Sequence, residues 1–333
     1  MRILLTGGAG FIGSHTALAV LAAGHEAILF DDFSNSSPEV VDRLSELAGR
    51  PITAVRGDVR DRDLLKSVFS SYQLDAVIHF AAKKSVAESV ADPLSYHHNN
   101  VGGMLAVLEA MDAAAVRTIV FSSSATVYGN PDQLPISEEG PTRAVNPYGQ
   151  TKLICENMLS DLARSDRGWR VSLLRYFNPV GAHPSGLIGE DPLGTPTNLM
   201  PILARVALGR SPRLEVFGRD YPTADGTAVR DYIHVVDLAE GHVAALEALA
   251  QGDALQVFNL GTGRGTSVRE LIVAFERASG QTIPCADAAR RSGDVAELYA
   301  AVDKAERELG WRATRGLTDM CADSWRFATR NNG

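Results

Sequence analysis

The chain contains 333 residues, of which 45% are hydrophobic and 22% charged, and its formal net charge at pH 7 is −8. These fractions are typical of a globular protein with a sizeable core. No basic run stands out, which argues against nucleic acid or an anionic membrane as a partner. The few, widely spaced cysteines and the histidines form no metal-ligand pattern, so we expect no metal site. No apolar segment is long enough to span a bilayer and no signal sequence is apparent, which favours a cytoplasmic location.

In the first half of the chain, short apolar runs alternate with segments that have helical periodicity. We expect helices over 94–115 and 147–164, and strands at Ile3–Thr6, Ala27–Phe30, Ile52–Arg56, Ala76–Phe80, Thr118–Ser122 and Val171–Arg175. Strands that alternate with helices form a parallel sheet covered on both faces, which binds ligands beyond the carboxyl ends of its strands. The prediction is an α/β fold with a Rossmann-type doubly wound parallel sheet.

After about residue 175 this alternation breaks down. Residues 178–227 are rich in proline and glycine, which predicts long loops, whereas 231–250 and 257–261 return to a helix and a strand. We therefore expect a dinucleotide-binding Rossmann domain over 1–177, to which 231–262 return. A smaller C-terminal α/β substrate domain would occupy 178–333.

A glycine-rich segment, Gly7-Gly-Ala-Gly10-Phe-Ile-Gly13, follows the first predicted strand and opens a helix. Gly7 permits a tight turn, Gly10 lets the backbone approach a pyrophosphate, and Gly13 lets the helix pack close to the sheet. The pyrophosphate would rest on the helix N-terminus, where free N–H groups and the helix dipole favour negative charge. A tight turn without a ligand is the alternative, but the position between a strand and a helix favours a dinucleotide site.

The ends of the next predicted strands indicate which dinucleotide binds. Asp31 can accept hydrogen bonds from ribose hydroxyls and would repel a 2′-phosphate. With Asp32 beside it and no arginine in Phe33–Ser36, NAD is favoured over NADP. Asp58 could contact the adenine ring or could simply stabilise a turn, and the residues alone support both roles equally. The small residues after Phe80 would let the cofactor pass close to the backbone.

A hydroxyl-rich strand end and a tyrosine–lysine pair form the third motif. The run from Ser122 to Gly129 contains Ser124, and Tyr148-Gly-Gln-Thr-Lys152 places two side chains on one helix face. Tyrosine, with a pKa of roughly 10, is a poor base at neutral pH, but an ammonium group and the nicotinamide cation stabilise its anion. Tyr148 would then accept a proton from a hydroxyl held by Ser124 while hydride leaves the same carbon. An exposed Tyr/Lys pair without a catalytic role is the alternative.

Several longer segments carry a resemblance to a known family. They are Asp75–Ala81, Asn99–Val101, Phe121–Gly129, Arg175–Gly186, Asn198–Pro201 and Val229–Val235. On these segments the chain resembles the extended short-chain dehydrogenase/reductase family, and within it the UDP-hexose 4-epimerases. The resemblance implies an NAD-dependent isomerase that interconverts UDP-galactose and UDP-glucose through a bound 4-keto sugar, with Ser124, Tyr148 and Lys152 as catalytic residues.

The same resemblance implies which residues contact the ligands. Those implied for NAD are Gly7, Gly10, Phe11, Ile12, Gly13, Asp31, Asp32, Asn35, Ser36, Asp58, Val59, Phe80, Ala81, Ala82, Lys84, Asn99, Ser124, Tyr148, Lys152 and Phe177. Those implied for the UDP-hexose are Ser124, Tyr148, Asn178, Asn198, Leu199, Phe217, Arg230, Arg291, Asp294 and Leu298. For Arg291 and its neighbour Arg290, a solvated basic pair is the alternative.

Two positions depart from the pattern of this family. Leu298 stands where epimerases restricted to non-acetylated sugars have tyrosine and where those that accept N-acetyl sugars have a small residue. We therefore expect a preference for UDP-glucose and UDP-galactose, with some turnover of UDP-GlcNAc and UDP-GalNAc. Lys83 stands where the family usually has an apolar residue, which leaves open whether Lys83 or Lys84 contacts the cofactor.

Related reactions remain as alternatives. Sugar-nucleotide 4,6-dehydratases carry Asp-Glu where this chain has Ala125-Thr126, and related decarboxylases carry glutamate at the position of Thr126, so both lose support. Another UDP-sugar 4-epimerase and an oxidoreductase that releases ketone and NADH stay open. A non-catalytic NAD-binding sensor would usually lack the Tyr148/Lys152 pair.

The two long predicted helices also bear on assembly. Segments 94–115 and 147–164 carry apolar stripes that core packing explains by itself. In the family the corresponding helices pair with those of a second subunit in a four-helix bundle. The resemblance, rather than the pattern, therefore implies a homodimer.

Overall fold

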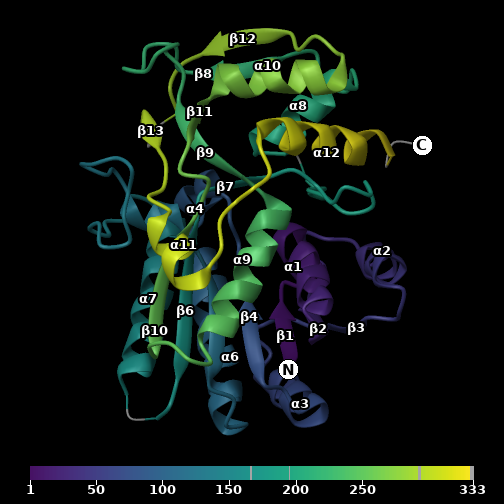
Figure 1. The fold of residues 1–333 in the computed structure, drawn as a ribbon, viewed down its shortest axis with the longest axis vertical. Coiled ribbons are helices and arrows are strands. Elements are labelled where there is room, and N and C mark those ends of the chain that lie inside the picture. The colour runs from purple at the N-terminus through teal and green to yellow at the C-terminus, as the bar shows by residue number, and fades with distance from the viewer. Residues whose placement is uncertain (166, 195, 292–293, 331–333) are drawn as a thin grey trace.

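The computed structural model describes residues 1–165, 167–194, 196–291 and 294–330. Its larger part is built on a seven-stranded parallel sheet with the order β10-β6-β5-β4-β1-β2-β3 (Figure 1). The strands are β1 (Arg2–Thr6), β2 (Glu26–Asp31), β3 (Thr53–Arg56), β4 (Ala76–His79), β5 (Thr118–Ser124), β6 (Arg170–Tyr176) and β10 (Leu255–Leu260). The predicted Rossmann-type sheet is confirmed, with a strand at each predicted position.

Both faces of this sheet are buried, which explains why its strands appear in the sequence as continuous apolar runs. Leu5 and Ile78 belong to the core on one face, which is covered by α1 (Phe11–Ala22), α2 (Glu39–Ala48) and α9 (Val235–Ala248). Leu4 and Val77 belong to the core on the other face, which is covered by α3 (Arg62–Tyr72), α6 (Gly102–Ala113) and α7 (Pro147–Arg164). The sheet is therefore the rigid layer on which the ligand-binding turns are placed.

The helix predicted over 94–115 is present, but it is interrupted by a π-helical turn. The chain forms α4 (Val86–Ala91), α5 (Pro93–Tyr96), a π-helical turn at His97–Val101 and then α6. The buried Asn100 side chain accepts the Lys83 N–H at 2.8 Å and donates to the Thr151 hydroxyl at 3.0 Å. These bonds anchor the π-helical turn to the segment after β4 and to α7, and turns of this kind are frequent at functional sites.

The remaining elements form smaller layers at one end of the large sheet (Figure 1). A four-stranded sheet contains β7 (Asn178–Val180), β9 (Val229–His234), β11 (Gly265–Ser267) and β13 (Glu297–Leu298), and a two-stranded sheet contains β8 (Leu214–Phe217) and β12 (Cys285–Ala288). Their apolar side chains pack in a separate core with α8 (Leu199–Ala207), α10 (Val268–Ser279) and α12 (Leu317–Arg330). A final helix, α11 (Asp303–Leu309), packs on α9 and β10.

The segment predicted to begin a helix at residue 231 is instead a strand up to His234. The helix α9 begins at Val235, because the His234 side chain caps it by accepting the Val236 N–H at 3.1 Å. In the sequence, α9 and β10 come after β7 and β8, the first strands of the smaller sheets. In space, α9 packs on α1 and β10 extends the large sheet. The domain limits given above stay a prediction.

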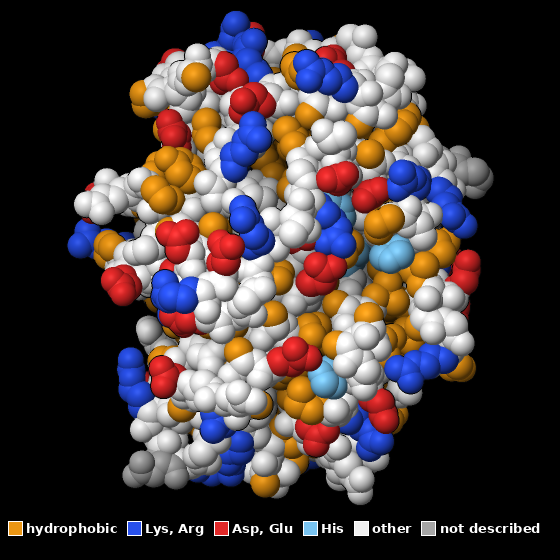
Figure 2. Space-filling view, in the orientation of Figure 1, with side chains coloured by type: hydrophobic (Ala, Val, Ile, Leu, Met, Phe, Trp, Pro, Cys, Tyr) orange, Lys and Arg blue, Asp and Glu red, His pale blue; other side chains and the backbone are white. Residues whose placement is uncertain are grey.

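The outer surface mixes charges of both signs. Figure 2 shows acidic and basic side chains interspersed on one face, with apolar side chains between them. Among the helices that the structure describes, none has the length and apolar character needed to cross a bilayer.

Candidate active site

The glycine-rich segment forms a tight turn between β1 and α1, and Gly7, Gly8 and Gly13 leave no room for a side chain. Gly7 has a φ of 69°, and a Cβ there would lie 2.8 Å from the backbone nitrogen of Ala81. A Cβ on Gly13 would lie 2.3 Å from the Gly7 carbonyl oxygen. Gly10 caps α1 without a side chain, and the first turn of that helix carries no acidic residue. The tight turn therefore leads into the N-terminus of α1, whose first N–H groups lack partners within the helix, and this arrangement fits the diphosphate of a dinucleotide.

Asp31 ends β2 and ties together two turns at the carboxyl edge of the sheet. Its carboxylate accepts hydrogen bonds from the Ala9 N–H at 2.9 Å, the Phe33 N–H at 2.9 Å and the Ser36 hydroxyl at 3.1 Å. Burial raises the pKa of this carboxyl above its ordinary value, and the hydrogen bonds oppose that shift. Besides the predicted ribose contact, Asp31 thus has a structural role that sequence reasoning missed.

The other predicted adenosine contacts lie around the ends of β2 and β3. Asp32 and Asn35 are exposed, and Val59 is buried. Asp58 is bound by Arg60, whose Nε lies 2.9 Å and 3.0 Å from the two carboxylate oxygens. This pairing holds the pKa of Asp58 below its ordinary value. An ion pair within the loop is a third role for Asp58, beside the two considered from the sequence.

The segment after β4 runs along the glycine turn. The N–H groups of Phe80 and Ala81 donate to the Thr6 carbonyl oxygen at 2.9 Å and 3.0 Å. Asn99, in the π-helical turn, donates through its amide to the Asn100 side-chain oxygen at 3.0 Å. The segment that continues into Ala82 therefore lies at the carboxyl ends of β1 and β4, where doubly wound sheets bind their ligands.

The two adjacent lysines of this segment have different partners. The Lys83 ammonium donates to the Ser95 hydroxyl at 2.7 Å and lies 3.4 Å from the Glu88 carboxylate, so it belongs to the α4–α5 region. The Lys84 ammonium lies 2.9 Å from the carboxylate of Glu190, in the segment between β7 and α8. Lys84 is thus bonded to the part of the chain that carries predicted UDP-sugar contacts.

Tyr148 and Lys152 lie one turn apart at the start of α7. The Asn146 side chain caps this helix by accepting the Gly149 N–H at 2.8 Å. The Lys152 ammonium is buried, donates to the Ser122 carbonyl oxygen at 2.6 Å and lies 6.0 Å from the centre of the Tyr148 ring. The cap and the lysine together fix where the tyrosine stands relative to the end of β5.

Burial acts against the charged forms of this pair. It lowers the pKa of Lys152 to about 8 and raises that of Tyr148, although a hydrogen bond with Ser124 lowers the Tyr148 pKa in part. Ser124 ends β5, and its oxygen accepts from the Thr126 N–H at 3.2 Å and the Thr126 hydroxyl at 3.0 Å. Its own proton can therefore be donated to Tyr148 or to a substrate oxygen. The structure brings the three residues together, and their catalytic roles stay a prediction.

Sequence reasoning missed a buried ion pair beside these residues. Glu156, one turn of α7 after Lys152, accepts hydrogen bonds from Arg175 of β6 at 3.0 Å and 2.7 Å. Ser123 also donates to Glu156, and Arg175 donates to the Tyr128 hydroxyl at 3.0 Å. The negative charge of Glu156 favours the ammonium form of Lys152. A glutamate spaced like Tyr148 and Lys152 along the same helix face was the signal in the sequence.

The predicted specificity residue lies close to this centre. Leu298 and Phe177 pack in one apolar cluster with Ala125, the residue that follows the candidate catalytic serine. Leu298 of β13 is paired in register with Arg230 of β9. The guanidinium of Arg230 lies 3.9 Å from the carboxylate of Asp294. Four predicted ligand contacts are therefore grouped around the pairing of β9 with β13.

The two adjacent arginines at the end of β12 also have different partners. Arg290 donates to the Asp220 carboxylate at 2.7 Å and stacks on Tyr221 with 4.2 Å to the ring centre. The guanidinium of Arg291 stacks on Phe217, 3.9 Å from the ring centre. Only Arg291 therefore adjoins another predicted substrate residue, whereas Arg290 is engaged in a surface ion pair.

The predicted asparagines lie at the starts of two elements. Asn178 begins β7, which pairs with β9. Asn198 precedes α8, whose first residue is Leu199, and its amide donates to the Glu190 carboxylate at 2.5 Å. Glu190 thus contacts one predicted cofactor residue and one predicted substrate residue, and sequence reasoning did not single it out. Among the described residues, no group of three His, Cys, Asp or Glu side chains could hold a metal ion.

The family comparison agrees with this geometry. The model of the NAD dependent epimerase/dehydratase family matches residues 3–261. The UDP-glucose 4-epimerase of Bacillus subtilis (strain 168) is 56% identical over 331 residues, covering 99% of this chain and 98% of that protein. UDP-glucose 4-epimerase 2 of Arabidopsis thaliana is 54% identical, covering 99% of this chain and 95% of that protein.

Two solved structures are similar to this chain over nearly its whole length. The UDP-glucose-4-epimerase of Stenotrophomonas maltophila with bound NAD and formylated UDP-arabinopyranose has a TM-score of 0.97 at 49% identity, covering 99% of this chain and 98% of that one. The Bifidobacterium longum UDP-glucose 4-epimerase in complex with NAD+ and UDP has a TM-score of 0.96 at 50% identity, covering 99% of each chain. This protein belongs to the NAD-dependent epimerase/dehydratase family.

Proposed function

We propose that this chain interconverts UDP-galactose and UDP-glucose by oxidising and then reducing C4 of the sugar, with NAD as a retained cofactor. The observation that carries the proposal is the Tyr148–Lys152 pair beside Ser124, at the sheet edge where the glycine turn fits a diphosphate. The UDP-glucose 4-epimerases similar to this chain along nearly its whole length support it.

The residues at the sheet edge suit NAD. Steric crowding at Gly7 and Gly13 leaves a cradle that only a side-chain-free backbone can form around a diphosphate. We assign Asp31 and Asp58 to the adenosine end, Lys84 to the diphosphates, and Phe177 to the nicotinamide end. When bound, NAD supplies the acceptor for the C4 hydride and the donor for its return.

The proton moves through the side chains of this chain. Tyr148 takes the proton of the C4 hydroxyl, and Ser124 donates a hydrogen bond to the same oxygen and limits its movement. The Lys152 ammonium, held by the Ser122 carbonyl oxygen, favours the tyrosinate by its charge. In the reverse step Tyr148 returns the proton to the same oxygen, so that the residues end unchanged.

Inversion requires a firmly held nucleotide and a sugar that can turn. We assign Arg291 and Arg230 to the UDP diphosphate and ribose region, and Asn178 and Asn198 to the diphosphate and sugar. Phe217, on which Arg291 stacks, offers an aromatic edge to the nucleotide. The keto sugar can then swing about its diphosphate link and present its opposite face for reduction. Asp294, Leu199 and Leu298 would complete the wall around the nucleotide and the sugar.

We further propose a cytoplasmic homodimer. Four apolar side chains of the α4–α6 region are exposed, Val86 at 40%, Val90 at 63%, Leu94 at 80% and Leu105 at 42%. A second copy packed against α6 and α7 in a four-helix bundle would cover apolar surface here. Light scattering should then give twice the chain mass, and charged substitutions at Leu94 and Leu105 should give the single-chain mass. Monomeric wild type would contradict the dimer.

The proposal is tested by incubating purified protein with UDP-galactose without added NAD. Chromatography should show UDP-glucose, while the absorbance of free NADH stays flat. Free NADH with a ketone product would instead identify an oxidoreductase, and a 4-keto-6-deoxy product would identify a dehydratase. No conversion, even with NAD supplied, would contradict the proposed activity.

A further inference from the structure

We propose that Glu190 is a positioning residue that couples the cofactor site to the nucleotide-sugar site, by orienting Lys84 and Asn198 together. The inference rests on the proposed function, because Lys84 and Asn198 are assigned there to NAD and to the UDP-sugar. One oxygen of the Glu190 carboxylate accepts from both partners, at 2.9 Å from Lys84 and 2.5 Å from Asn198. One atom thus joins the segment after β4 to the start of α8.

The side chain of Glu190 is too buried for an ordinary surface ion pair. Its exposed fraction is 8%, against 50% for the side chain of Lys84. The second carboxylate oxygen is buried and has no hydrogen-bond partner among the residues that the structure describes. A buried, half-satisfied carboxylate is costly unless a cation stays beside it. The ion pair with Lys84 therefore keeps the Glu190 side chain in position. Without the Lys84 cation, the part of the chain around Glu190 would be held less firmly.

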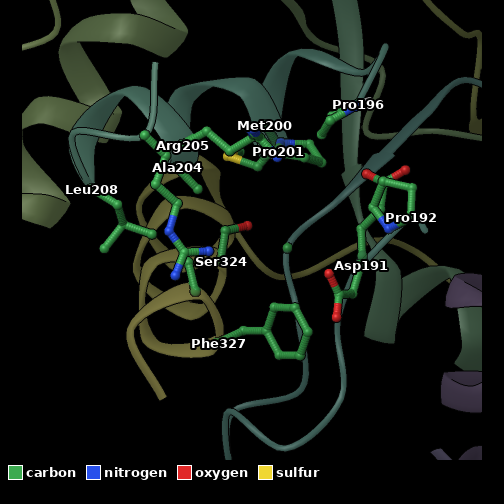
Figure 3. A pocket seen from close by; sticks show the side chains of 14 residues that line it. Asp191, Pro192, Pro196, Met200, Pro201, Ala204, Arg205, Leu208, Ser324 and Phe327 are labelled. Carbon is green, nitrogen blue, oxygen red and sulfur yellow. The ribbon is translucent and has the colours of Figure 1, made fainter. Parts of the chain in front are cut away.

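Packing alone does not hold this segment. Figure 3 shows a cavity between Asp191, Pro192 and Pro196 on the segment, Met200 on α8 and Phe327 on α12. The cavity has a volume of about 140 Å³, and Glu190 is among its lining residues. A segment that borders a cavity gains less from apolar burial than one in a filled core. Its polar contacts to Lys84 and Asn198 therefore add to the hold that buried residues such as Ile188 supply.

The bonding pattern also fixes the rotation of the Asn198 amide. A carboxylate only accepts hydrogen bonds, so the NH₂ group of Asn198 must face Glu190. Its carbonyl oxygen and its second N–H are left for the nucleotide sugar. Lys84 likewise donates one of its three N–H groups to Glu190, and the other two remain available for the cofactor. Glu190 therefore orients both the group that binds NAD, Lys84, and the group that binds the nucleotide sugar, Asn198.

Coupling of this kind is reciprocal. If UDP binds Asn198 and stabilises the segment, it also holds Lys84 in position against the cofactor and so strengthens NAD binding. Bound NAD must then strengthen UDP binding by the same factor. For wild type we expect UDP to slow the loss of NAD several-fold. Glu190→Gln keeps the shape of the side chain but removes the charge that holds Lys84, so the effect of UDP on NAD retention should disappear.

The test measures ligand binding, which does not depend on turnover. Calorimetry on the NAD-loaded protein gives the dissociation constant of UDP, and the NAD left after gel filtration with and without UDP gives the coupling. We expect Glu190→Gln to weaken UDP binding about tenfold, a loss of about 1.4 kcal/mol, and to raise KM more than it lowers kcat. Asp191→Asn is the matched control, since its exposed carboxylate borders the same cavity and has no ion pair among the described residues; it should change either quantity less than twofold.

Two further variants separate coupling from a general loss of structure. Glu190→Asp keeps the charge but shortens the reach, so it should recover part of the coupling. Combining Glu190→Gln with Lys84→Met should weaken UDP binding no more than the stronger single variant, because both remove the same contact. Additive effects, or a Glu190→Gln protein with wild-type coupling, would overturn the inference. If the wild-type protein binds UDP with the expected coupling but converts no UDP-hexose, the role of Glu190 stands and the proposed activity is wrong. If the wild-type protein binds no UDP, both are wrong.

Discussion

The two sides of the candidate site are built in different ways. Ser124 ends a central strand of the seven-stranded sheet, and Tyr148 and Lys152 stand on a long helix packed against it. The residues assigned to the UDP-sugar, such as Asn198 and Arg291, lie instead on short sheets and connecting segments with few polar partners. From this contrast we expect the proposed acid–base centre to be held rigidly by the core and the proposed substrate side to be more adjustable. An enzyme that must turn a sugar within its site needs both properties.

The largest effect is expected when the proposed base, Tyr148, is removed without disturbing the core that holds it. Tyr148→Phe keeps the ring and loses only the hydroxyl. We expect kcat to fall by about 10²–10⁴-fold, the usual contribution of a general acid–base group. The unfolding midpoint and the bound NAD content should stay near wild type, as followed by circular dichroism and by NAD extraction. Wild-type turnover in this variant would contradict the assignment of the base.

Lys152→Met should remove most activity and yet stabilise the fold at pH 7. The pKa of Lys152 is lowered from 10.5 to about 8, so the unfolded chain binds this proton more tightly and stability rises with pH between those values. Below pH 8 the buried ammonium lowers stability, by an amount on the order of 1–3 kcal/mol. Urea unfolding of NAD-free protein should show the variant more stable at pH 7, with the gain shrinking toward pH 10. A variant less stable at pH 7 would show that the lysine supports the fold.

The buried Glu156–Arg175 pair tests the rigidity of the catalytic side. Glu156→Gln leaves the buried guanidinium without its anion, which typically costs about 3–5 kcal/mol. The urea midpoint should drop accordingly, and the activity that remains should need a higher pH, since Lys152 loses a charge that favours its ammonium form and Tyr148 loses support. Exchanging Glu39, which pairs with Arg43 on the surface, for glutamine should change stability by less than about 1 kcal/mol. Equal effects of the two changes would contradict a special role for the buried pair.

Adjacent arginines offer a matched test of the adjustable side. Arg291→Gln removes the cation that stacks on Phe217, and we expect KM for UDP-galactose to rise about tenfold, as for loss of a charge-assisted hydrogen bond. Arg290→Gln removes only a surface pair with Asp220 and should change KM less than twofold. If both variants behave alike, the pair is a solvated basic patch and the diphosphate is bound elsewhere.

The smallest expected effect concerns sugar choice. Leu298 packs in one apolar cluster with Ala125 and Phe177, and we expect its size to set the room left for a substituent on the sugar. Leu298→Tyr should lower the rate on UDP-GalNAc relative to UDP-galactose by several-fold while changing the UDP-galactose rate little. Rates on both sugars for wild type and variant give this ratio. An unchanged ratio would remove Leu298 from the specificity argument.

The sequence predicts the rigid side better than the adjustable one, for a physical reason. Strands buried on both faces read as apolar runs, and the glycine turn and the Tyr148–Lys152 spacing are local patterns. Glu190 pairs with Lys84, which is 106 positions away in the chain, and Glu156 of α7 pairs with Arg175 of β6. The helical spacing of Glu156 is a local signal, but no local pattern reveals the partner of either glutamate. The π-helical turn was missed because it depends on Asn100 bonding to two other segments.

The boundary error at β9 has a similar origin. The sequence predicts that a helix begins at residue 231, but residues 231–234 lie in a strand between β7 and β11, and the His234 cap shows where α9 begins. The different partners of Lys83 and Lys84 also lie outside their own segment, and which lysine contacts the cofactor stays a prediction. The start of α9 and the partners of the two lysines are therefore set by contacts with residues outside the local segment, rather than by local helix or strand propensity.

An isotope label can show whether a single retained NAD takes the C4 hydride and returns it to the same carbon. The protein would be given UDP-galactose that carries deuterium at C4, with unlabelled NADH in the surrounding solution. Mass spectrometry and NMR of the UDP-glucose formed should show the deuterium still at C4. Loss of the label to water or to the free NADH would contradict the account.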